Sequence, residues 1–260
     1  MINESLEKIV IKAGEIIKEN FYQPKEVKFK GEIDLVTKFD IEIENFLRKE
    51  LENIYHDYII IGEEQAYNKD LITKPNRIYI DPIDGTTNFV HSIPFVAISI
   101  GIIKNNDFYE GIVYNPILNE FFYAKKGQGA FLNKKKISVS SETELKKSLV
   151  VTGFPYNIRS DEQAFNWNMN IVKKVLKNTL AFRRLGSAAI DLCYVARGSY
   201  EIFYEMGLKP WDVAAGILIV KEAGGEVTNE KEGKFDLHKD NIIVATNSLL
   251  HRKVIEFLIT

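Results

Sequence analysis

The sequence predicts a layered protein of mixed α/β (α+β) class, in which two β-sheets are separated and covered by helices. Three observations predict this class. Apolar residues at helical spacing fill most of residues 1–54. A block over about 95–132 reads as short strands joined by tight turns, as in an antiparallel meander. From about residue 148 onward, short apolar strands alternate with helices.

The first elements are helical. Apolar residues recur at helical spacing over residues 2–21 and again over 37–54. Thr37 and Asp40 have the spacing of a capping box, with Asp in place of the usual Glu or Gln, so we expect the second helix to begin there. The residues between the two helices, 25–36, alternate loosely and predict an extended segment.

Short apolar runs predict the strands of both sheets. In the N-terminal part, strands are expected at residues 58–61, 77–80, 95–103, 109–114, 120–124 and 130–132. In the C-terminal part, strands are expected at residues 149–152, 180–185, 200–204, 226–228 and 242–246. Helices are expected there at residues 161–177, 187–196 and 210–223 and from about 248. We interpret residues 1–260 as one fold with subregions of about 1–147 and about 148–260.

Composition excludes several classes of protein. The 260 residues include 34 Lys and Arg against 36 Asp and Glu, a net charge of −2. A protein that binds nucleic acid usually carries a basic excess, so we expect no direct contact with nucleic acid. With 45% hydrophobic and 27% charged residues, the chain has the composition of a globular protein rather than of a disordered or fibrous one.

The single cysteine, Cys193, cannot form an internal disulfide, and its apolar neighbours predict that it lies in the core. A lone thiol agrees with a reducing, cytoplasmic location. The N-terminus has no signal-peptide pattern, and the longest apolar stretch, at 95–103, is far shorter than the ~18 residues of a membrane helix. The lysine run at 134–136 is expected to be a solvated turn.

Acidic residues follow the predicted strands and open one predicted helix. Glu63 and Asp81 each follow an apolar strand, Asp84 comes three residues later, and Asp212 lies in the first turn of a helix that starts at a proline. Carboxylates gathered in one cleft repel one another unless a cation or a shared proton lies between them. Oxygen ligands without nearby Cys or His favour Mg²⁺ or Mn²⁺ over zinc.

The string Asp-Pro-Ile-Asp-Gly-Thr-Thr at residues 81–87 favours phosphate chemistry. Pro82 bends the chain as it leaves the strand, which can turn both aspartates and the Ile83 carbonyl toward one point. Gly85 and Thr86 then open a short helix, whose free amides can bind an anion. A metal site beside such amides is what a phosphate ester requires.

Three motifs carry a family resemblance. They are Gly62-Glu-Glu64, the string from Asp81 to Phe89, and Trp211-Asp-Val-Ala-Ala-Gly216 followed by Glu-Ala-Gly-Gly225. In this order they closely resemble the inositol monophosphatase family, part of the lithium-sensitive, Mg²⁺-dependent phosphatase superfamily that includes fructose-1,6-bisphosphatases. The resemblance covers almost the whole chain.

The resemblance implies a five-layered αβαβα fold and hydrolysis of a phosphate monoester of inositol or a sugar by in-line attack of a metal-activated water. It also implies about two or three Mg²⁺ ions, which Mn²⁺ could replace, lithium sensitivity and a homodimer. The metal-ligand positions fall on Glu63, Asp81, the Ile83 carbonyl, Asp84 and Asp212. The catalytic positions fall on Glu63, Thr86 and Asp40, the last two as a hydrogen-bonded pair that orients the water. The substrate-binding positions fall on Asp84, Gly85, Thr86, Gly186, Ser187, Ala188, Glu205 and Asp212.

Several alternatives stay open at the level of sequence. The substrate could be fructose 1,6-bisphosphate, alone or with inositol phosphates. Asp84-Gly-Thr also resembles haloacid-dehalogenase-type phosphatases, but those need Asp-x-Asp and the spacing here is Asp-x-x-Asp. A third alternative is a protein-interaction or transcription-associated role. The family often carries a catalytic-loop lysine within residues 25–36; Lys28 or Lys30 could fill that position, although solvated loop lysines are the simpler expectation.

Overall fold

The structure is a computed structural model that describes residues 2–31, 33–65 and 69–259. The α-helices are α1 (Glu4–Asn20), α2 (Lys38–Glu52), α3 (Thr86–Val90), α4 (Glu162–Asn178), α5 (Ala188–Ala196), α6 (Pro210–Glu222) and α7 (His251–Ile259). Short 3-10 helices are formed by Lys69–Thr73 and Leu145–Lys147. Within the described ranges, no helix combines the length and the apolar character needed to cross a membrane.

The first large sheet has seven strands in sequence order. They are β3 (Ile59–Gly62), β4 (Arg77–Asp84), β5 (Ala97–Lys104), β6 (Asp107–Asn115), β7 (Glu120–Lys125), β8 (Gly129–Leu132) and β9 (Lys135–Ile137). β3 pairs with β4 in parallel, and every later neighbour is antiparallel. The predicted antiparallel meander is therefore confirmed.

The second large sheet has five strands in the order β11-β10-β12-β14-β13. They are β10 (Leu149–Val151), β11 (Ala181–Arg183), β12 (Ile202–Met206), β13 (Glu226–Asn229) and β14 (Ile242–Thr246). β10 runs parallel to both of its neighbours, whereas β14 is antiparallel to β12 and β13. A separate hairpin pairs β1 (Val27–Phe29) with β2 (Leu35–Thr37) in the segment predicted to be extended.

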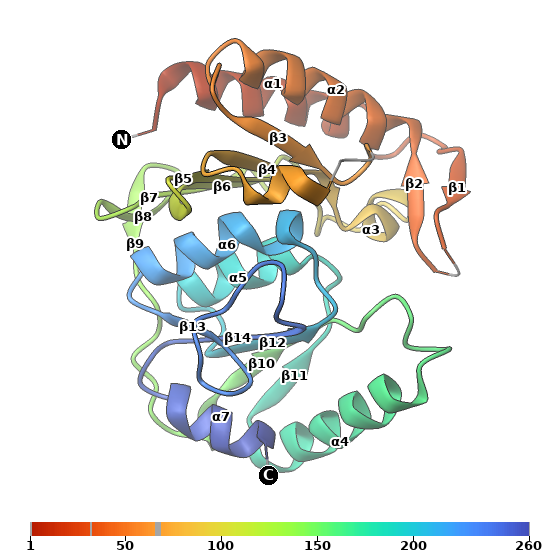
Figure 1. Ribbon diagram of the computed structural model, residues 1–260. Helices are drawn as coiled ribbons and strands as arrows, with labels where there is room; N and C mark the ends of the chain where they lie inside the picture. Colours follow the sequence, from red (N-terminus) through yellow and green to blue (C-terminus); the bar gives the residue numbers. More distant parts are fainter. Residues whose placement is uncertain (1, 32, 66–68, 260) are drawn as a thin grey trace.

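Helices and sheets stack in five layers, as the family resemblance implied (Figure 1). α1 and α2 cover the outer face of the seven-stranded sheet, α5 and α6 lie between the two large sheets, and α4 and α7 cover the far face of the five-stranded sheet. Every residue of α5 is buried, since apolar surface meets it on both sides. Cys193 lies in this middle layer, as predicted.

Two glycines allow α6 to pack closely on the seven-stranded sheet. A Cβ atom on Gly101 would lie 2.5 Å from the Cβ of Ala214, and one on Gly111 would lie 2.6 Å from the carbonyl oxygen of Ala215. The missing side chains let the helix backbone rest directly on β5 and β6. This contact sets the depth of α6 in the molecule and therefore the position of Asp212 in its first turn.

The lysine run at 134–136 is more than a turn. Asn133 and Lys134 have positive φ and form the turn, but Lys135–Ile137 then pairs with β8 as the edge strand β9. The prediction of a turn alone was wrong because lysines are also typical of edge strands, where they face solvent and discourage pairing with another chain. The predicted solvent exposure of the lysine residues is confirmed.

We expect Gly111→Ala to destabilise the protein, because the added methyl group meets the backbone of α6. The free energy of unfolding should fall by about 1–3 kcal/mol. Urea unfolding followed by circular dichroism measures the change. Gly31→Ala is the matched control, since its Cβ would meet only Asp34 Cβ at 3.6 Å. Equal stability of the two variants would contradict this account of the packing of α6.

Candidate active site

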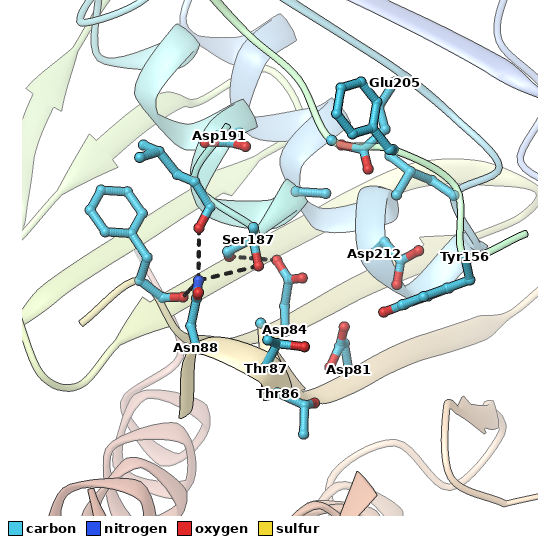
Figure 2. Close-up of a pocket in the computed structure, with 18 of the residues that line it drawn as sticks. Asp81, Asp84, Thr86, Thr87, Asn88, Tyr156, Ser187, Asp191, Glu205 and Asp212 are labelled. Atoms are coloured by element: carbon cyan, nitrogen blue, oxygen red, sulfur yellow. Dashed lines mark hydrogen bonds between the residues drawn. The ribbon is translucent and has the colours of Figure 1, made fainter. Parts of the chain in front are cut away.

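A cavity of about 470 Å³ opens where the end of β4 meets the starts of α3, α5 and α6 (Figure 2). It brings together predicted site residues from distant parts of the chain. Those that line it are Glu63, Asp81, Ile83, Asp84, Gly85, Thr86, Gly186, Ser187, Ala188, Glu205 and Asp212. Asp40 is the one predicted residue outside the lining, and it lies directly behind Thr86.

The end of β4 is irregular, which aims its polar groups into the cavity. The register with β5 shifts between Asp81 and Asp84, at the position of Pro82. Such a bulge redirects side chains that a regular strand would send to alternate faces. The backbone N–H of Ile83 donates to Asp81 Oδ1 at 3.0 Å, and its carbonyl accepts from Thr86 Oγ1 at 3.0 Å.

Gly85 allows the start of α3 to pack closely against the start of α5. Its φ of 94° lies in the left-handed region, and a Cβ there would lie 2.7 Å from the carbonyl oxygen of Phe95 and 3.0 Å from that of Gly186. Asn88 Nδ2 donates to the carbonyl oxygens of Phe95 and Leu185, both at 2.8 Å. The two helix starts are thereby held against each other on one side of the cavity (Figure 2).

Asp84 links the N-terminal part of the chain to α5. Its Oδ2 accepts a hydrogen bond from Ser187 Oγ at 2.7 Å and another from the backbone N–H of Ala189 at 2.6 Å. The positive end of the helix dipole adds to this stabilisation of a carboxylate. Burial nevertheless raises the pKa of Asp84 to about 6, with a further contribution from the charge of Glu63.

The predicted contact between Thr86 and Asp40 is present. Thr86 Oγ1 lies 3.0 Å from Asp40 Oδ1, while Asp40 Oδ2 accepts from the backbone N–H of Thr37 at 2.8 Å and from its hydroxyl at 2.6 Å. The capping box at the start of α2 is therefore formed as predicted. Because Asp40 is only 1% exposed, these hydrogen bonds fix the orientation of the Thr86 hydroxyl.

A second acid on α2 holds the turn that carries Glu63. Glu44, four residues after Asp40, is fully buried; it accepts the backbone N–H of Glu64 at 2.7 Å and an Arg48 guanidinium N–H at 3.1 Å. A Cβ on Gly62 would lie 2.2 Å from its carboxyl carbon, so the motif requires glycine there. The sequence analysis did not single out Glu44. Its four-residue spacing from Asp40 was the available signal, because this spacing places both carboxylates on one face of α2.

Lys30 contacts the acidic residues of the turn after β3. Its Nζ lies 2.6 Å from Glu63 Oε1 and 2.9 Å from Glu64 Oε1. Burial opposes the charge, but the attraction of the two carboxylates raises the pKa of the Lys30 ammonium. Lys28 and Lys30 are both exposed, as expected, but Lys30 also forms ion pairs that the sequence analysis did not predict. The β1–β2 hairpin brings Lys30 to Glu63 through a tertiary contact that local patterns do not reveal.

The carboxylates of the cavity lack sufficient compensating charge. Burial raises the pKa of both Asp81 and Asp212 well above the ordinary range, and the charges of Glu63 and Asp84 raise them further. Burial, followed by the charge of Asp84, likewise raises the pKa of Glu205 to about 8. Such mutual destabilisation is expected where a cation normally shares the site.

The donor atoms fit a hard divalent cation, although the side chains are turned toward protein partners. In the part of the chain that the structure describes, no three His, Cys, Asp or Glu side chains are arranged to hold a metal ion. Glu63 faces Lys30, and Asp212 Oδ2 accepts the backbone N–H of Lys209 at 2.7 Å. Carboxylate and carbonyl oxygens that lack charge compensation are nevertheless the ligand set that Mg²⁺ and Mn²⁺ prefer.

A cavity with uncompensated carboxylates beside two helix starts is typical of enzymes that use metal ions to hydrolyse phosphate esters. A model of the Inositol monophosphatase family matches residues 2–258. Tomato (Solanum lycopersicum) inositol monophosphatase 3 is 43% identical over 251 residues, 95% of this chain and 92% of that protein. Human (Homo sapiens) inositol monophosphatase 1 is 38% identical over 245 residues, 93% of this chain and 88% of that protein.

Solved structures agree with the sequence comparisons. The crystal structure of extragenic suppressor protein suhB from Bartonella henselae matches with a TM-score of 0.90 at 33% identity, covering 98% of this chain and 97% of that one. The chain therefore belongs to the inositol monophosphatase family, a family of phosphoric monoester hydrolases that are generally metal-dependent.

Glu205→Gln should stabilise the metal-free protein increasingly as pH rises. Because the folded-state pKa is about 8 against an ordinary 4.5, the folded protein holds this proton more tightly. The resulting stability is fully present below about pH 4.5 and is lost as pH rises toward about 8. Thermal unfolding in EDTA at pH 5 and at pH 8 measures the effect. A Tm difference between variant and parent that is the same at both values would contradict it.

Proposed function

We propose that the protein hydrolyses a phosphate monoester of inositol or of a sugar in a reaction that depends on Mg²⁺. The observation that carries this proposal is the set of buried, mutually repelling carboxylates beside the starts of α3 and α5. Such a set binds a divalent cation more readily than it tolerates its own charge. Membership in the inositol monophosphatase family supports the reaction class.

The residues that would hold the cations are Glu63, Asp81, Asp84, Asp212 and the carbonyl of Ile83. When bound, divalent cations neutralise charge on the phosphate and leaving oxygens and make a water molecule more acidic. Mn²⁺ could replace Mg²⁺, because it prefers the same oxygen ligands. The Lys30 ammonium would compete with a metal ion for Glu63, since its Nζ lies 2.6 Å from Glu63 Oε1.

Thr86 and Asp40 would orient the attacking water. The Thr86 hydroxyl lies 3.0 Å from Asp40 Oδ1 and from the Ile83 carbonyl oxygen, so it donates its proton toward these acceptors. Its lone pairs are then free to accept a hydrogen bond from a water molecule in the cavity. We assign the pair a role in positioning the nucleophile and in moving its proton.

Two groups of residues would bind the substrate. The backbone amides at Gly85 and Thr86, which have no partner within α3, would hold phosphate oxygens. Gly186, Ser187 and Ala188 at the start of α5 would contact substrate hydroxyls. Glu205 and Asp212 complete this second group from the opposite wall (Figure 2).

Inositol 1-phosphate is our first candidate substrate, because the curated relatives are named inositol monophosphatases. Fructose 1,6-bisphosphate, alone or as a second substrate, is the alternative, since it also carries a phosphate beside hydroxyls. Hydrolysis of both esters, assayed with and without Mg²⁺ and with added LiCl, tests the reaction and its expected lithium sensitivity. Absence of hydrolysis of any sugar or inositol phosphate at saturating Mg²⁺ would refute the proposal.

Further expectations about this protein remain predictions. A homodimer follows from the family resemblance, and static light scattering of the purified protein decides it. A monomer under assay conditions would refute the homodimer.

The cytoplasmic location inferred from the single cysteine is checked by fractionation of the native cell. A transcription-associated or other protein-interaction role would be favoured by a partner that still binds the Asp84→Asn variant.

Asp84→Asn and Asp212→Asn should abolish Mg²⁺-dependent phosphatase activity while leaving the fold intact, because each removes charge that would compensate the cation. Initial rates at saturating substrate measure the loss, and far-ultraviolet circular dichroism checks the fold. Asp240→Asn is a matched control, since Asp240 is outside the cavity lining. Activity within about tenfold of the parent in either cavity variant would overturn the assignment of these ligands.

A further inference from the structure

We propose that Asp191 is a specificity-determining residue that, with Glu205, binds ring hydroxyls of a polyol phosphate. The inference rests on the proposed function and goes beyond it by assigning a substrate contact. Both residues line the cavity, and they belong to different elements, α5 and β12. In Figure 2 they lie at the end of the cavity away from Thr86 and Asp81. A substrate with its phosphate near Thr86 would therefore extend its alcohol part toward Asp191.

Asp191 is placed by the geometry of α5. It lies three residues after Ala188, and residues at this spacing share one face of a helix. The start of the helix faces the cavity through Gly186 and Ser187, so the same face carries Asp191 along the cavity wall. The position is a rigid one, because every residue of α5 is buried.

The carboxyl of Asp191 is buried, and one of its two oxygens has no protein partner. It is 1% exposed, and its Oδ1 has no hydrogen-bond partner. Among the described residues, none of the ion pairs includes Asp191. A buried polar atom without a partner is costly, so an Asp at this position needs a ligand or a water that supplies the missing hydrogen bond.

The unpartnered carboxyl oxygen of Asp191 can accept a hydrogen bond from a hydroxyl group. Glu205 and Asp84 are the charged groups that act on it, and burial together with their charges raises the pKa of Asp191 well above the ordinary range. An ionised carboxyl accepts a hydrogen bond from a hydroxyl group and a protonated carboxyl can also donate one, so either form can bind a hydroxyl. Asp84 Oδ2 already accepts from Ser187 and Ala189, whereas Asp191 keeps free hydrogen-bonding capacity.

A purely structural role for Asp191 can be separated from substrate binding by comparison with Asn168. Asn168 on α4 is also fully buried and also has a side-chain oxygen without a partner. It does not line the cavity. Loss of either polar group should change stability, but only loss of Asp191 should change the choice of substrate.

The experiment compares myo-inositol 1-phosphate with phenyl phosphate, which also has a six-membered ring but carries no ring hydroxyls. The readout is the ratio of kcat/KM for the two esters, measured with Mg²⁺ for the 260-residue chain and its variants. Asp191→Leu should lower this ratio by about tenfold or more, mainly through KM for the inositol ester. Asp191→Asn should keep the ratio within about threefold of the parent, because an amide also donates and accepts. Asn168→Leu should keep the parental ratio.

The outcomes separate the inference from the proposed function. An Asp191→Leu ratio equal to that of the parent would overturn the role of Asp191, while the phosphatase activity itself would stand. A parent protein that hydrolyses no inositol or sugar phosphate at saturating Mg²⁺ would instead refute the proposed function. If the leucine variant does not fold, Asp191→Ala replaces it with the same expected loss. A lowered ratio in Asn168→Leu would also count against the inference, because it would make the effect one of stability.

Discussion

The electrostatic cost of burying carboxylates together is the constraint on which this structure depends. Glu63, Asp81, Asp84 and Asp212 share one cavity, and burial and mutual repulsion raise the pKa of the three aspartates above the ordinary value. Such an arrangement lowers the free energy of unfolding unless a cation is bound. The fold meets part of the cost with hydrogen bonds, from Ser187 and Ala189 to Asp84 and from Lys209 to Asp212, and it leaves the rest for a ligand.

Helices α2 and α5 hold most of the polar side chains of the cavity in place. α2 presents Asp40 and Glu44 one turn apart, so a single rigid element fixes both the Thr86 hydroxyl and the turn that carries Glu63. α5 receives Asp84 at its start and carries Asp191 one turn later. Because these helices pack against the sheets, the site is as rigid as the core. A substitution that disturbs this packing would therefore shift the side chains of the cavity.

Local patterns predicted much of the fold and of the site. The capping box of Thr37 and Asp40 and the bend at Pro82 depend on neighbouring residues, so the sequence alone could reveal them. The ion pairs of Lys30 and the role of Glu44 were not predicted, because they depend on partners that are distant along the chain. The resemblance supplied the five layers and the grouping of distant acids, which spacing alone does not determine.

The central claim is that the cavity carboxylates form a divalent cation site that the metal-free protein holds at an electrostatic cost. The most direct test is a crystal structure of the protein with Mn²⁺, with anomalous scattering used to locate the metal. We expect Mn²⁺ bonded to oxygens of Glu63, Asp81 and Asp84, with Lys30 displaced from Glu63. A structure with saturating Mn²⁺, no anomalous peak in the cavity and Lys30 still on Glu63 would contradict the claim.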